Sequence, residues 1–224
     1  MSRIAIIDYF SMIIPLFDGR LHALLAFLVY VTPLLLGGCA TVASPEYKVL
    51  EQREGYEVRQ YNRHLLAETE VRGPYRQSLN QGFRILFDFI SGNNEGKAPI
   101  EMTAPVLQET KPEPEKIGMT APVLTESQED MNVIAFIMPT KYTMKTLPRP
   151  KDLRVTIRET PPRKVAVLTY SGYATEERVR KEVDRMRSML ARDGIRPAST
   201  FHSAQYNPPW TLPFLRRNEI MVDL

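Results

Sequence analysis

The sequence predicts an α+β fold in which an antiparallel sheet, or distorted β-barrel, is flanked by two helices. Three observations support this prediction. Strand and helix patterns follow one another in the order β-β-α-β-β in each half, each half has one amphipathic helical stretch, and one six-residue sequence occurs twice. We therefore expect a single domain over residues 47–224, built from pseudo-repeats over about 47–145 and 151–224.

The first forty residues indicate a secreted protein. Two arginines precede an apolar run over residues 21–36, the run leads to Cys39, and no basic flank follows it. This pattern is typical of a secretory signal peptide, and a proline inside the run makes a retained membrane helix the weaker alternative. We predict a signal peptide over residues 1–38 and a tether over residues 39–46.

Cys39 is the only cysteine in the chain, so no disulfide can form within it. Residues 36–39, Leu-Gly-Gly-Cys, resemble the lipobox of bacterial lipoproteins, in which the cysteine is acylated and becomes the first residue. The resemblance implies a lipid anchor on Cys39 and a cell-envelope location on the periplasmic side. Ala40 stands where an aspartate would indicate inner-membrane retention, which favours the outer membrane in an organism that has one. The alternative is a lone cysteine within the signal segment.

Charge and motif content exclude several function classes. The formal net charge is +3 and there is no block of Lys and Arg, so nucleic acid is not an expected partner. No cluster has metal-ligand spacing, and the H-E-x-x-H and G-x-S-x-G motifs are absent, which argues against a cysteine or zinc hydrolase. Glutamates on predicted strands leave acid-base chemistry open, although solvated strand faces explain them without any function. These residues are Glu57, Glu68, Glu70, Glu101 and Glu219.

The first half begins with two predicted strands, over residues 56–61 and 64–71, in which apolar and polar residues alternate. A helix is predicted over residues 75–90, where apolar residues fall at helical spacing, and Ser91 with the following glycine provides its end. Another strand is predicted over residues 133–138.

The repeated sequence Met-Thr-Ala-Pro-Val-Leu occupies residues 102–107 and 119–124. Each copy is predicted to be a strand, because Met, Ala and Val would share one face of an extended chain. The proline in each copy places it at a sheet edge, a bulge or a strand end. A duplicated structural hairpin explains this repeat without any function. The intervening residues 108–116, rich in Pro, Glu and Lys, predict an exposed loop.

The second half repeats the same order of elements. Strands are predicted over residues 153–159 and 164–170, and a helix is expected to begin after Thr175 as N-cap and to end at Gly194. Two closing strands follow, over residues 200–206 and 218–222.

Three motifs resemble the SOUL heme-binding family. They are Tyr-Glu-Val-Arg-Gln-Tyr at 56–61, Met-Thr-Ala-Pro-Val after Ser-Gly-Asn-Asn at 91–94, and Tyr-Asn-Pro-Pro-Trp at 206–210 with Arg-Asn-Glu at 217–219. The resemblance covers about residues 45–224, and the doubled Met-Thr-Ala-Pro-Val is similar to the bacterial branch. It implies a duplicated antiparallel barrel with two helices, similar to effector-binding domains. It also implies that heme or a related tetrapyrrole binds in a shallow apolar cleft beside the first helix.

The resemblance also implies which residues contact the ligand. Phe83 stands where a family methionine contacts the porphyrin, and Phe87 and Ile90 extend that face. Asn80 stands where family members have a cation for a propionate, and Arg84, one helical turn away, is the candidate replacement. Because Phe83 and Phe87 lie at helical spacing, a simple helix-on-sheet core explains them equally well.

His64 is the candidate axial ligand for heme iron, four residues from Gln60, where some family members have a histidine. A surface histidine on a strand is the ordinary alternative, and the metal ligation is otherwise unknown. Trp210, flanked by prolines, is interpreted as a residue that braces a loop.

The combined expectation is a lipid-anchored extracytoplasmic protein that binds heme or a related tetrapyrrole by apolar enclosure. Two alternatives stay open from the sequence. One is an enzyme that degrades its bound heme with tyrosine or carboxylate groups as acid and base. The other is an envelope scaffold that uses the same cleft for a protein partner.

Overall fold

The computed structural model describes residues 44–111 and 131–224, and all structural statements refer to these residues. In chain order its elements are β1 (Tyr47–Arg53), β2 (Tyr56–Tyr61), β3 (His64–Arg72), α3 (Tyr75–Ile90), β4 (Val106–Lys111), β5 (Met131–Ile137), β6 (Thr156–Thr160), β7 (Arg163–Tyr170), α4 (Glu176–Arg192), β8 (His202–Gln205), the short 3-10 helix η2 (Pro213–Leu215) and β9 (Asn218–Asp223). No described helix is both long enough and apolar enough to cross a membrane.

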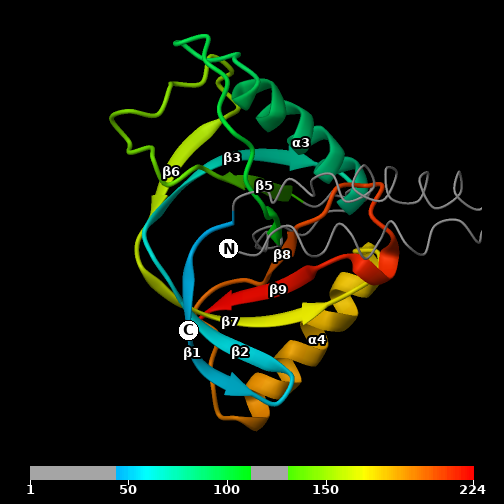
Figure 1. Ribbon diagram of the computed structural model, residues 1–224. Helices are drawn as coiled ribbons and strands as arrows, with labels where there is room; N and C mark the ends of the chain where they lie inside the picture. The colour runs from blue at the N-terminus through cyan, green and yellow to red at the C-terminus, as the bar shows by residue number, and fades with distance from the viewer. Residues whose placement is uncertain (1–43, 112–130) are drawn as a thin grey trace, which may run out of the picture. The chain divides into compact units, whose positions relative to one another are not determined.

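The described strands form one antiparallel sheet of nine strands in the order β1-β2-β7-β9-β8-β4-β5-β3-β6. Without β1 this order has an internal symmetry. The units β2-β3-α3-β4-β5 and β6-β7-α4-β8-β9 occupy equivalent places on either side of the β4-β8 pair. The sheet curls, and α3 and α4 lie on its outer face (Figure 1). The predicted α+β fold with duplicated β-β-α-β-β units is therefore confirmed.

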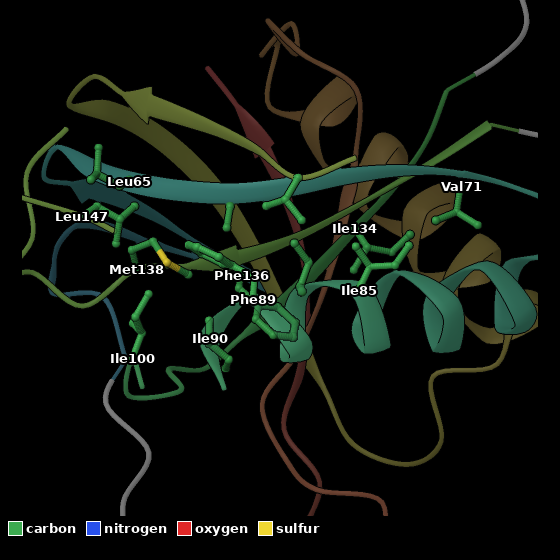
Figure 2. Close-up of a cluster of buried hydrophobic side chains, with 13 residues drawn as sticks. Leu65, Val71, Ile85, Phe89, Ile90, Ile100, Ile134, Phe136, Met138 and Leu147 are labelled. Carbon is green, nitrogen blue, oxygen red and sulfur yellow. The ribbon is translucent and has the colours of Figure 1, made fainter. Parts of the chain in front are cut away.

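Both faces of the central strands are buried, and alternate residues of each strand point to opposite faces. On β5, Ile134 and Phe136 face α3, whereas Ala135 and Ile137 belong to a separate cluster on the inner face. Figure 2 shows the first cluster, in which side chains of α3 meet those of β3 and β5. A third cluster lies between α4 and the sheet. Residues 42–224 form a compact unit that contains all three clusters, so this unit is expected to fold without the residues that precede it.

Local sequence signals position the two helices. Gly82 lets α3 approach the sheet closely, since a Cβ atom at this position would lie 2.7 Å from the Cβ of Ile134. At the start of α4, the Thr175 hydroxyl accepts a hydrogen bond from the Arg178 amide at 3.2 Å, as an N-cap should. The helix ends just before Gly194, which has a φ of +70° that favours glycine. Both predicted ends of α4 are confirmed.

The first copy of the repeated hexapeptide differs from the prediction. Only Val106 and Leu107 belong to a strand, β4, and the peptide bond between Ala104 and Pro105 is cis. Burial does not alternate either, because Thr103 turns inward and its hydroxyl donates a hydrogen bond to the Ile137 carbonyl. The strand prediction is therefore wrong for most of this copy. The second copy, residues 119–124, lies outside the described residues.

Two further predictions need correction. Residues 108–116 were expected to form an exposed loop, but Gln108–Lys111 continue β4, and Gln108 is buried with its amide donating to the Tyr75 carbonyl at 3.0 Å. The rest of that segment lies outside the described residues.

Strand β1 was not predicted at all. All of its residues are exposed, so burial imposes no alternation of apolar and polar residues on it.

Candidate functional site

The exposed side of α3 carries two adjacent stripes of side chains. Residues four apart on a helix lie on the same face. Leu79, Phe83 and Phe87 therefore form an apolar stripe, and Arg76, Asn80 and Arg84 form a polar one beside it. The opposite side of α3 is buried against the sheet, through Tyr75, Ser78, Gly82, Ile85, Leu86, Phe89 and Ile90.

Phe83 and Phe87 form a stacked aromatic pair. Their ring centroids are 5.8 Å apart and the ring planes differ by 11°. Phe83 also packs on the core, because its ring contacts that of Phe136 on β5 edge to face, with the ring centroids 5.3 Å apart. Phe87 remains 48% exposed. The Phe87 ring therefore presents an exposed aromatic surface that stacks on Phe83, which packs on the core.

The polar stripe borders a shallow pocket of about 630 Å³ on the outer face of α3. Arg76, Asn80 and Arg84 line it together with Gln77 and Gln81. Neither arginine forms an ion pair with any described residue. The sequence analysis missed Arg76. Its position one helical turn before Asn80 could have identified it.

Ile90 does not face this surface. It is 3% exposed and packs in the cluster beneath α3, where Figure 2 shows it near Phe89. Of the sequence-predicted residues, the structure thus brings Phe83, Phe87, Asn80 and Arg84 together on the exposed side of the helix. Cys39 lies outside the described residues.

His64 lies in a different place, at the start of β3. It lines a pocket of about 300 Å³ with Met138, Thr103 and Lys141, and no residue of α3 contributes to the described lining. The imidazole Nδ1 is 2.8 Å from the Asn62 carbonyl. A carbonyl can only accept a hydrogen bond, so Nδ1 carries the proton and the neutral ring leaves Nε2 as an acceptor. Nε2 is buried and has no described partner.

The buried position of His64 predicts a loss of stability in mild acid. Burial is the largest of the causes that lower its pKa below the ordinary value of 6.5, and the nearby Arg163 and Arg158 lower it further. Between the folded pKa and pH 6.5 the unfolded chain therefore binds more protons than the folded one. The contribution of His64 to the free energy of unfolding should be complete above pH 6.5 and should be lost as the pH drops through this window.

Urea unfolding of the wild type and His64→Gln between pH 7.5 and 5 measures this effect. The variant should show a smaller decrease over this range. Some decrease should remain, because burial also lowers the pKa of His202. An identical pH dependence in both proteins would show that His64 does not contribute.

The inner face of the curled sheet contains a buried ionic network centred on Glu219 of β9. Its Oε1 is 3.0 Å from Arg59 Nη1 and 2.6 Å from Arg217 Nη2, and its Oε2 accepts a hydrogen bond from the Tyr206 hydroxyl at 2.6 Å. Burial and the Glu219 charge raise the pKa of Tyr206. Glu219 is fully buried, so the expectation of a solvated strand face is wrong for this residue. Two arginines surround this carboxylate, so its removal would leave the buried Arg59 charge without its partner.

Comparison with known proteins decides the family. Residues 42–223 match the sequence profile described as "SOUL heme-binding protein". The chain belongs to the SOUL heme-binding protein family. Human "Heme-binding protein 2" is 26% identical over 187 residues, covering 81% of this chain and 85% of that protein. "Heme-binding protein 1" of Xenopus laevis is 27% identical over 191 residues, covering 83% and 93%.

The fold of this SOUL-family chain is also similar to that of a solved structure. The C-terminal domain of EcmrR superposes with a TM-score of 0.54 at 9% identity, covering 79% of this chain and 96% of that one. At this identity the likeness concerns the fold alone.

Proposed function

We propose that this SOUL-family protein binds heme or a related tetrapyrrole on the exposed side of α3. The observation that carries the proposal is the stacked pair Phe83 and Phe87, of which Phe87 is half exposed, on the same side of the helix as two arginines that have no ion-pair partner among the described residues. The names of its human and Xenopus relatives support the same ligand class.

The residues on this face suit a tetrapyrrole. A flat apolar macrocycle over Phe87 would remove the exposed ring from water, at about 25 cal/mol per Å² of apolar surface, and offset stacking adds to this. Two propionates need cations, and Arg76 and Arg84 are spaced along the helix beside the aromatic stripe. Helix α3 contains no His, Met or Cys, so binding there would not depend on an iron ligand from this helix.

Replacing Phe87 with alanine is expected to weaken hemin binding about tenfold, because the exposed half of the stacked surface is lost. A titration followed by the Soret absorbance measures this, with hemin and with the iron-free porphyrin. Both ligands should bind the wild type, since no metal ligand is required.

Phe214→Ala is the matched control, as it removes an exposed aromatic ring far along the chain from α3. It should leave hemin binding unchanged. If Phe214→Ala lost binding and Phe87→Ala did not, the ligand would lie at the C-terminal loop. If the wild type bound neither ligand, the proposed function would fail.

We also propose that the protein is lipid-anchored in the cell envelope, on the periplasmic side and at the outer membrane where one exists. The support comes from residues 36–39 and from the apolar run before them. Expression in a bacterium with labelled fatty acid should label the wild type, and Cys39→Ser should abolish the label. Equal labelling of the two proteins would contradict acylation at Cys39.

A further inference from the structure

The loop over residues 208–216, between β8 and β9, exposes an unusual group of large apolar side chains. Trp210 is 83% exposed and Phe214 is 71% exposed, and Leu212 and Leu215 are also exposed. Tyr173, from the connection between β7 and α4, is exposed beside them. The expectation that Trp210 braces a loop is therefore wrong. Single exposed apolar residues are common, but a contiguous group indicates an interaction surface.

This loop is braced from within, so its apolar side chains are held outward. Arg216 donates from Nε to the Thr211 carbonyl at 2.8 Å and from Nη2 to the Pro209 carbonyl. The Gly172 amide donates to the Pro213 carbonyl at 2.9 Å, which joins the loop to the connection that carries Tyr173. The internal hydrogen bonds of the loop thus fix the conformation in which these apolar side chains are exposed.

The charge beside these side chains is positive. The guanidinium of Arg216 lies 4.6 Å over the Tyr173 ring, and both of its described hydrogen bonds go to carbonyl groups. No described carboxylate pairs with it. Tryptophan, phenylalanine and leucine next to an arginine make up the composition that binds the interfacial region of a bilayer.

We infer that the loop over residues 208–216 docks on an anionic lipid bilayer, with Trp210, Phe214 and Leu215 in the interfacial region and Arg216 facing lipid phosphates. The contact orients the domain on the membrane. It goes beyond tetrapyrrole binding and does not require the lipid anchor, because the loop supplies its own apolar and cationic groups.

Trp210 is the only tryptophan in the chain, so its fluorescence reports on this loop alone. The compact unit over residues 42–224 is mixed with phosphatidylcholine vesicles, with or without phosphatidylglycerol. Emission should shift to shorter wavelength, and more strongly with the anionic lipid. The double change Phe214→Ser with Leu215→Ser should weaken binding to the anionic vesicles about tenfold or more.

Leu153→Ser is the matched control, since Leu153 is 98% exposed but lies in the connection before β6. It should bind vesicles as the wild type does, and an equal loss would show non-specific adsorption. The inference would be overturned if anionic vesicles caused no shift in the emission of Trp210. It would also be overturned if hemin quenched this fluorescence while vesicles had no effect on it. The Soret titration on the same samples is independent of these results, so failure of membrane docking and failure of tetrapyrrole binding are distinguishable.

Discussion

Replacing Glu219 with alanine is expected to lower the free energy of unfolding by about 3–5 kcal/mol. Glu219 is fully buried, and the Arg59 side chain that it neutralises is only 3% exposed. Without the carboxylate, Arg59 keeps a desolvated positive charge, and its remaining described carboxylate partner is Glu57, at 2.7 Å. The Tyr206 hydroxyl also loses its acceptor. Breaking one side of a buried pair costs more than the pair itself contributes, because the remaining charge has no water to solvate it.

Chemical denaturation of the wild type and the variant measures this loss. Glu219→Gln should lose less, since the amide keeps the shape and one acceptor oxygen but removes the charge. Glu54→Ala is the control, as Glu54 pairs with Arg192 at 3.4 Å but is almost fully exposed, and its removal should cause no measurable change. A small effect of Glu219→Ala would show that water reaches the inner face of the sheet.

Replacing Phe89 with alanine is expected to lower the free energy of unfolding by about 3–5 kcal/mol. Phe89 is 1% exposed and lies at the centre of the cluster between α3 and the sheet (Figure 2). The change removes a buried ring and leaves a cavity beneath the helix. Because a close-packed core relaxes only partly, the lost contacts are not regained.

Phe87, two residues earlier on the same helix, provides the matched comparison. Phe87→Ala should cost about 1 kcal/mol or less, because its ring is half exposed and loses mainly the stacking with Phe83. Denaturation and hemin titration together separate the two roles. Phe89→Ala should primarily reduce stability, and Phe87→Ala should primarily reduce ligand affinity. Equal losses of stability would contradict the division of α3 into a buried face and a ligand face.

Much of the fold was predictable because helices and half-buried strands impose their periods on the sequence. Both helices were found from apolar spacing, and the N-cap of α4 from Thr175 alone. Strand β1 was missed because an exposed strand imposes no alternation. The strand prediction over 102–107 failed because a hydrogen bond from Thr103 to a strand distant in sequence turns that side chain inward.

The candidate site was predictable to a similar extent. Phe83, Phe87, Asn80 and Arg84 come together because they share one helix, where spacing determines the face. His64 belongs to another pocket, and its distance from α3 depends on how the sheet curls. The role of Glu219 could not be predicted for the same reason, since its partner Arg59 comes from β2 and its partner Tyr206 follows the end of β8.

The sequence alone determined the duplicated α+β order, the two helices, the family motifs and the predicted anchor segment. These features follow from residues close together in the chain. Only the tertiary structure decided that Ile90 supports the helix from below, that Glu219 is buried between two arginines, and that Trp210 stands exposed on a braced loop. Burial and ion pairing depend on which strands and loops, distant in the sequence, pack against one another. The spacing of residues along the chain does not specify these contacts.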